Sequence, residues 1–463
     1  MKKSRILALL LCLCMLVGVL AACSKTDTTT PDASGETAQS GDTAKTGDTA
    51  KTGDVVTIRM WGGVPAESGP QAACDAFNEA YKDKGIQVEY ERFVNDDTGN
   101  VKLETNLLGG NEIDVYMSYT MAQLSKRAEG NMALDLTELC ERDGFDLTQY
   151  LGDLAKNYYV DGKPFCIPCK LDQYSMVVNK TMFDEAGIEV PTEWTYDEFL
   201  DVCAKLTHGE GTDKVYGVFW NSQQDMAQYA QFMIQQTLGG DNMYNADGTA
   251  TNFTDDVWQK TISLISTTMN EGYAPTHADS VTEKLSQESM FLGGKAAMTI
   301  GPWMVRNIKD TETYPHDFVT AFAPYPVVSE DQRNYTQGGY GDLLCINPRS
   351  EHLDEAWEFA KWYLTEGGLY LASGGRVPAA NTYNADDVVN AFLSGAENLF
   401  DADSTKAVLI TPHDNYAAPS ITTKNAELTD IINEELEAIY TGQKTVEEGL
   451  ESAKTRGDAA LAG

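Results

Sequence analysis

The sequence predicts an α/β protein, because strand-like and helix-like patterns alternate along the chain. Residues 55–61 are rich in β-branched side chains and end at a Gly-Gly pair, which is typical of a strand. Residues 70–81 carry apolar side chains at helical spacing, and residues 86–90 alternate as in a second strand. We expect further strands over 113–117 and 216–219. Strands that alternate with helices indicate a sheet flanked by helices.

A helix start is predicted near the middle of the chain. Thr195 and Glu198 have the spacing of a capping box, and Trp194 and Phe199 have the spacing of a hydrophobic staple. The same T-x-x-E pattern recurs at 445–448. We therefore interpret Trp194 as a structural residue rather than a binding residue. Three further tryptophans fall in helical segments and are expected to pack in the core: Trp258, Trp357 and Trp362.

The composition is that of a folded protein with two or three domains. The chain has 463 residues, of which 42% are hydrophobic and 22% are charged. Lys and Arg total 34 whereas Asp and Glu total 70, which gives a net charge of −36. Nucleic acid is a polyanion and requires a basic surface, and no basic run is visible. Nucleic-acid binding is therefore excluded as a function.

The first residues predict an export signal. Lys2, Lys3 and Arg5 precede an apolar run over 6–20, which is shorter than the roughly 20 residues of a membrane-spanning helix. The run ends in Leu-Ala-Ala-Cys, and this ending resembles a bacterial lipobox. The resemblance implies that residues 1–22 are a signal peptide and that the thiol of Cys23 carries lipid. The alternative is an ordinary signal peptide followed by a coincidental cysteine.

A low-complexity segment follows Cys23. Residues 24–54 consist mainly of Ser, Thr, Gly, Ala, Asp and Lys, and the hexapeptide GDTAKT occurs twice in tandem. Such a segment has too little apolar surface to form a core. Thirty-one flexible residues have an r.m.s. span of about 30 Å. We interpret residues 23–54 as a lipidated cysteine and a tether that hold the folded part away from a membrane.

Several sequence phrases, taken together and in this order, are similar to a known family. They resemble the extracellular solute-binding proteins of ABC importers, in the carbohydrate-binding branch (family 1) that includes maltose-binding protein. The most specific phrase is FLGGKAAMTIGPW at 291–303. Val178 is a departure, since the family usually has an aromatic residue there. The other phrases are DGKPFCIP at 161–168, VNKTMF at 178–183, AGI at 186–188 with PTEWT at 191–195, the helix-like 348–364, and GRVP at 375–378.

The resemblance implies a type II periplasmic-binding-protein-like fold. This fold has two α/β lobes, each a sheet flanked by helices, and three hinge crossings between them. We place the crossings near 170–172, 322–324 and 376–378. The first lobe is then expected over 55–170 plus 324–375, and the second over 171–323 plus 376–463.

The resemblance also implies a function. It predicts a monomeric receptor that captures a sugar or oligosaccharide in the cleft between the lobes and delivers it to membrane permease subunits. The receptor would be lipid-anchored on the extracytoplasmic face of the cell membrane and would have no catalytic activity and no cofactor. Two alternatives remain open: a receptor of the same fold for a polyamine, a peptide or another solute, and a secreted glycosidase with two positioned carboxylates.

A sugar site needs flat aromatic surfaces together with short polar side chains. We expect the site where strands and crossings end, because ligands of α/β sheets bind at the carboxyl ends of strands. Trp303 matches a sugar-stacking tryptophan of the family. The other expected aromatic residues are Trp61, Tyr119, Trp220 and Tyr340, and the expected polar residues are Glu67, Asp172, Asn221, Asp342 and Arg376.

The cysteines and histidines form no recognisable catalytic or metal-binding motif. Phosphate-binding, zinc-protease and nucleophile-elbow patterns are absent from the sequence. Cys166 and Cys169 form a C-x-x-C pair without the second pair that a zinc site requires. We interpret this pair as a coincidence, and a disulfide or thiol role is the alternative.

Overall fold

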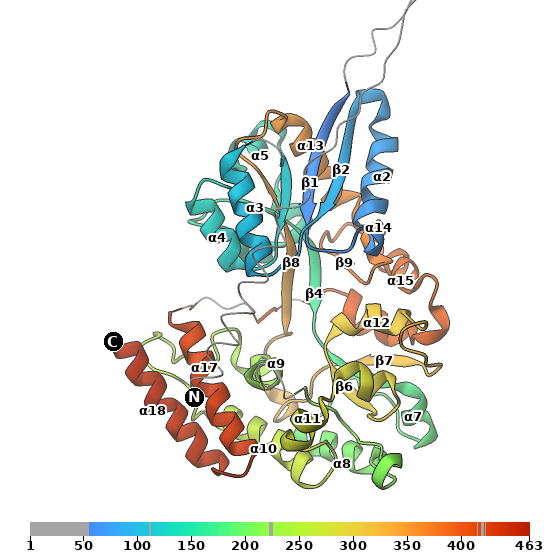
Figure 1. The fold of residues 1–463 in the computed structure, drawn as a ribbon, viewed down its shortest axis with the longest axis vertical. Helices are drawn as coiled ribbons and strands as arrows, with labels where there is room; N and C mark the ends of the chain where they lie inside the picture. Colours follow the sequence, from blue (N-terminus) through green and yellow to red (C-terminus); the bar gives the residue numbers. More distant parts are fainter. Residues whose placement is uncertain (1–54, 111–112, 222–225, 414, 418–420, 422) are drawn as a thin grey trace, which may run out of the picture. The chain divides into compact units, whose positions relative to one another are not determined.

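The computed structural model describes residues 55–110, 113–221, 226–413, 415–417, 421 and 423–463. These residues form an α/β fold with two sheets (Figure 1). The six-stranded sheet has the order β2-β1-β3-β8-β4-β9, and the three-stranded sheet has the order β6-β5-β7. The strands are β1 (Val56–Gly62), β2 (Ile86–Arg92), β3 (Val115–Ser118), β4 (Ile167–Gln173), β5 (Met176–Asn179), β6 (Met298–Ile300), β7 (Thr320–Ala323), β8 (Gly338–Ile346) and β9 (Val377–Pro378).

Helices connect the strands and cover both sheets. Up to β7 they are α2 (Pro70–Ala80), α3 (Asp97–Gly109), α4 (Met121–Glu129), α5 (Thr137–Asp143), α6 (Leu147–Leu151), α7 (Lys180–Glu185), α8 (Tyr196–Leu206), α9 (Met226–Leu238), α10 (Asp256–Asn270), α11 (His277–Glu283) and α12 (Val305–Lys309). After β8 they are α13 (Leu353–Thr365), α14 (Gly368–Ala372), α15 (Ala385–Leu393), α16 (Ala402–Ser404), α17 (Asn425–Tyr440) and α18 (Val446–Ala462).

Each sheet has apolar side chains packed against both of its faces. On one face of the six-stranded sheet, Phe77 of α2 and Trp357 of α13 belong to the core. On the other face, Leu103 of α3 and Leu124 of α4 belong to a second apolar cluster. The strands β5, β6 and β7 are buried throughout, which fits a sheet that helices cover on both faces.

The chain passes between the two sheets at β4. This strand pairs with β8 and β9 in the six-stranded sheet, and Figure 1 shows β4 and β8 side by side. Only Tyr174 and Ser175 separate β4 from β5 of the other sheet. The chain returns from β7 to β8 and leaves the six-stranded sheet again after β9. The lobe boundaries expected from the sequence stay a prediction.

The α/β prediction is confirmed, and so are most of the local elements. The strands near 55, 86 and 113 and the helix that begins at Pro70 are present. Thr195 and Glu198 form the expected capping box, and the rings of Trp194 and Phe199 meet edge to face with their centroids 5.1 Å apart. The predicted signal peptide, Cys23 and the tether lie outside the described residues.

The strand predicted over 216–219 is wrong. Its backbone groups pair with two different segments, so no regular ladder forms. The backbone N–H of Val218 donates to the carbonyl of Tyr273, whereas that of Phe219 donates to the carbonyl of Met298. Gly217 lies so close to α8 that a Cβ atom there would be 2.5 Å from the carbonyl oxygen of Cys203. Residues 217–220 are therefore buried without belonging to a strand, and Tyr216 forms only an isolated bridge to Ala296.

Among the described residues, no helix combines the length and the apolar character that crossing a membrane requires.

A buried ion pair links β8 to the segment before β9. The Nε atom of Arg376 lies 2.7 Å from Oδ2 of Asp342, and both side chains are largely shielded from solvent. Asp342 has a φ of +46°, a conformation that side chains other than glycine seldom adopt. Burial by itself raises the pKa of the Asp342 carboxyl, but the positive charges of Arg376, Lys170 and Arg306 outweigh this effect and hold the pKa below its usual value.

We predict that Asp342→Asn lowers the free energy of unfolding at pH 7 by about 3 kcal/mol, because it leaves the buried Arg376 charge without a carboxylate. The pKa of Asp342 is lower in the folded chain than the value of about 3.9 in the unfolded chain. The stabilisation is therefore present at neutral pH and is lost as the pH falls below about 4.

Urea unfolding of the wild type and the variant at pH 7 and at pH 3 measures this difference. Asp201→Asn is the matched control, since it removes a carboxylate from the exposed face of α8. The difference in the free energy of unfolding between wild type and Asp342→Asn should be smaller at pH 3 than at pH 7. An equal difference at both pH values would contradict a stabilising role of the charged Asp342.

Candidate functional site

A cavity of about 150 Å³ lies where β4 leaves the six-stranded sheet. Its lining comes mainly from three stretches that are far apart in the sequence, within 170–174, 303–306 and 374–377. The first stretch is the end of β4 with Tyr174, and the second spans the start of α12. A cavity of this size accommodates roughly one six-membered ring. It brings together Asp172, Trp303 and Arg376, three of the residues that the sequence analysis selected.

A second, more open cavity of about 430 Å³ shares Arg306 and Gly374 with the first. Glu67, another of the selected residues, belongs to its lining and lies in a short helical turn over Ala66–Ser68. The two cavities together offer room for more than one sugar ring, since small-molecule sites measure roughly 300–1,000 Å³.

Trp303 is the tryptophan that presents a surface to the first cavity. It is 38% exposed, whereas the other six tryptophans are at most 7% exposed. Its Nε1–H donates to Oε1 of Gln287 at 3.2 Å, and the buried Gln287 in turn donates to the carbonyl of Ile300 at 2.5 Å. The ring also meets Tyr174 edge to face. These contacts hold an exposed indole in one orientation.

Gly301 allows this orientation of the indole. A Cβ atom at position 301 would lie 2.3 Å from the ring of Trp303, and the φ of +105° also favours glycine. Glycine is therefore needed at the first position of the Gly-Pro-Trp phrase to make room for the indole at the last position.

Asp172 and Lys170 form an ion pair beside Trp303, with 2.5 Å between Nζ and Oδ1. Both lie on β4 and point to the same face, because side chains two residues apart along a strand share a face. Gly341 of β8 lies opposite, and a Cβ atom there would be 2.7 Å from Oδ2 of Asp172. The absence of a side chain at Gly339 and at Gly341 makes room for Tyr158 and Asp172, respectively.

The sequence analysis missed Arg306, which lines both cavities. Solvent reaches its side chain, yet the surrounding protein lowers the pKa of the guanidinium, first by burial and then by the like charges of Arg376 and Arg92. It also missed Lys170 and Tyr174. Only their positions in the sequence could have indicated these residues. Arg306 follows the Gly-Pro-Trp phrase, and Lys170 and Tyr174 lie beside the expected first crossing.

Six of the selected residues lie outside the linings of these two cavities, and one of them, Asp342, forms the ion pair with Arg376 behind the first cavity. Trp61 is buried, with Nζ of Lys102 4.9 Å from its ring centroid, and Trp220 is buried and donates to Oγ1 of Thr268. Tyr340 donates to the carbonyl of Leu151 and lines a different cavity. The roles of these residues in ligand binding stay predictions, as do those of Tyr119 and Asn221.

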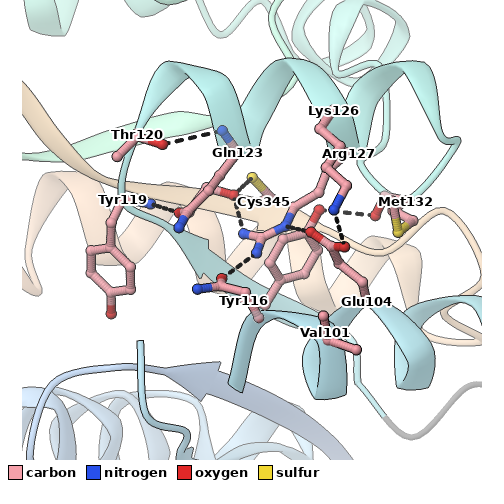
Figure 2. A network of polar contacts seen from close by, with 12 residues as sticks. Val101, Glu104, Tyr116, Tyr119, Thr120, Gln123, Lys126, Arg127, Met132 and Cys345 are labelled. Atoms are coloured by element: carbon pink, nitrogen blue, oxygen red, sulfur yellow. Dashed lines mark hydrogen bonds and ion pairs between the residues drawn. The ribbon is translucent and has the colours of Figure 1, made fainter. Parts of the chain in front are cut away.

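Tyr119 is held in place by a polar network on α4. Figure 2 shows the backbone N–H of Tyr119 donating to Oε1 of Gln123, at 2.9 Å. Arg127, one turn further along, is fully buried and has its Nε atom 3.4 Å from Oε1 of Glu104. The phenol oxygen of Tyr119 accepts the backbone N–H of Gly63. This tyrosine therefore ties the end of β1 to α4.

Cys166 and Cys169 do not form a disulfide. Both thiols are free and buried, and burial raises their pKa well above the usual value. They belong to the apolar clusters on opposite faces of the six-stranded sheet. The interpretation of the C-x-x-C pair as a coincidence agrees with this arrangement.

The sequence profile of a family described as bacterial extracellular solute-binding protein matches residues 62–369. A binding protein of Brucella abortus is 22% identical over 329 residues, which are 69% of this chain and 74% of that protein.

Solved structures share the fold. A sugar transporter of Rhizobium etli in an open conformation has a TM-score of 0.70 at 21% identity, covering 88% of this chain and 100% of its own. An ABC substrate-binding protein of Listeria monocytogenes has a TM-score of 0.64 at 18% identity, with coverage of 88% and 100%. The two-lobe, periplasmic-binding-protein-like α/β fold expected from the sequence is thus confirmed. The profile match shows that this chain belongs to the bacterial extracellular solute-binding protein family, whose members are receptors and not enzymes.

Proposed function

We propose that this protein is the substrate-binding receptor of an ABC importer and that it binds a sugar or oligosaccharide between its two lobes. The observation that carries the proposal is the exposed, immobilised ring of Trp303 beside the ion pair of Asp172 and Lys170. A flat indole packs against the C–H face of a sugar ring, and charged side chains at its edge bind the hydroxyl groups. Arg376 and Glu67 supply further polar contacts.

Structural neighbours support a carbohydrate ligand. The Listeria monocytogenes protein was solved in complex with cycloalternan, and a neighbour from Arthrobacter globiformis is a cyclic alpha-maltosyl-1,6-maltose binding protein. A neighbour from Thermotoga lettingae was bound with alpha-D-tagatose.

The charges around the first cavity disfavour a polyamine, the alternative ligand considered above. Lys170, Arg306 and Arg376 line it, together with a single carboxylate, that of Asp172. A polyamine would bring more positive charge to a site that already has a surplus of it. The family assignment argues against the glycosidase alternative.

Transport would follow from closure of the two lobes around the ligand. The ligand stabilises the closed form only through contacts that it gains there, and the closed form then docks on the permease subunits. The lipid on Cys23 and the tether would keep the receptor at the extracytoplasmic face of the membrane.

We predict that a sugar raises the melting temperature of the full chain, purified in mild detergent, in a screen of sugars, oligosaccharides, polyamines, amino acids and peptides. A ligand at 100 times its Kd adds about 2.7 kcal/mol of stability. Trp303→Ala should weaken binding by about 2 kcal/mol, roughly 30-fold, because the stacking surface is lost.

Tyr370→Ala is the matched control, since Tyr370 is another exposed aromatic residue and lines neither of the two cavities. Stabilisation by polyamines or peptides but by no sugar would refute a carbohydrate ligand. Equal binding by wild type and Trp303→Ala would refute the site.

For the anchor, we predict that cells incorporate an alkyne-labelled palmitate into the wild-type protein and not into the variant Cys23→Ser. The thiol of Cys23 is the attachment point that the lipobox resemblance implies. Cys140→Ser, which removes a partly buried thiol of the folded part, should keep the label. Label in Cys23→Ser equal to that of the wild type would contradict the anchor.

A further inference from the structure

The first cavity has an excess of positive charge although the protein as a whole is acidic. The chain has a net charge of −36. Around the first cavity, however, three cations (Lys170, Arg306 and Arg376) meet two carboxylates, those of Asp172 and of Asp342 behind it. An excess of one sign of charge in a cavity favours ligands of the opposite sign.

The ion pairs of the cleft identify the cation that is not neutralised. Lys170 is paired with Asp172, and the Nε atom of Arg376 is paired with Asp342. Within the described part of the chain, the guanidinium of Arg306 makes no hydrogen bond and no ion pair. The two carboxylates of the neighbouring cavity, Glu67 and Asp310, also form no ion pair with it.

The surroundings of Arg306 favour an anion. Burial lowers the pKa of its guanidinium, and so does repulsion by Arg376 and Arg92. Asp342 opposes this effect but forms no ion pair with Arg306. An anion that binds between Arg306 and Arg376 removes the repulsion and gains charge-assisted hydrogen bonds from a planar fork of donors. Arg306 lies three residues from Trp303, so the same ligand can contact both residues.

We infer that the sugar bound in this cleft carries an acidic group, a carboxylate or a phosphate, and that Arg306 binds this group beside Arg376. The inference rests on the proposed function, because it names the class of sugar that the same site receives. A neutral sugar would leave the unpaired guanidinium of Arg306 in the first cavity without a partner.

Calorimetric titration with paired probes tests the inference. The pairs are digalacturonate with galactobiose, glucuronate with glucose, and glucose 6-phosphate with glucose. For at least one pair, the full chain should bind the acidic member at least about tenfold more tightly at low salt. The preference should decrease at about 0.3 M salt, since solvent reaches Arg306. The first two pairs measure the preference for a carboxylate on the sugar, and the third pair measures the preference for a phosphate.

Arg306→Gln should weaken binding of the preferred acidic probe at least about tenfold more than it weakens binding of the neutral counterpart. Arg306→Lys keeps the charge without the planar fork and should show an intermediate loss. Lys205→Gln, which removes a positive charge from the exposed face of α8, is the control and should bind the acidic probe as the wild type does.

The outcomes separate the two proposals. If neutral sugars bind as tightly as their acidic counterparts, or if Arg306→Gln weakens both members of a pair equally, the acidic-group inference is overturned and the sugar-receptor function stands. If no sugar of either kind binds and a peptide or amino acid does, the proposed function fails and the inference fails with it.

Discussion

The buried ion pair between Asp342 and Arg376 is the interaction on which the cleft depends. Asp342 lies on β8 and Arg376 directly precedes β9, so the pair fixes the segment that leaves the six-stranded sheet. Asp342 has a positive φ, a conformation that persists only where the surrounding structure holds it. This carboxylate forms its ion pair with Arg376, and it attracts Arg306 without an ion pair between them. The ion pair that holds this segment therefore leaves Arg306 as the cation of the first cavity that has no ion-pair partner among the described residues.

Trp303 supplies the second constraint. An exposed indole on a mobile side chain would lose conformational entropy when a ligand bound, and preorganisation removes part of that cost. Gln287 and the absence of a side chain at Gly301 hold the ring before any ligand arrives. In the proposed function, a rigid stacking surface and a fixed cation lie at one site. The indole would give affinity for a sugar ring, and the cation would discriminate among sugars by charge.

The sequence predicted most of the fold but only part of the site. Fold elements follow from local patterns, whereas the site depends on residues that are far apart in the sequence. Apolar periodicity and capping patterns are local, so β1, α2 and the start of α8 could be predicted from short stretches. Residues 216–219 failed because their partners lie in separate segments. Trp61 and Trp220 looked like Trp303 in sequence, and only burial distinguishes them. Arg306 was missed because its significance comes from charges contributed by β2, β8 and the segment before β9.

A crystal structure of the full chain with the tightest-binding probe from the paired titrations would show whether Trp303 and Arg306 bind the ligand. We expect a sugar ring stacked on Trp303, with a carboxylate or phosphate oxygen within about 3 Å of the Arg306 guanidinium. A ligand bound outside the two cavities would contradict the assignment of the site. A ligand stacked on Trp303 whose acidic group faces solvent would contradict the role of Arg306.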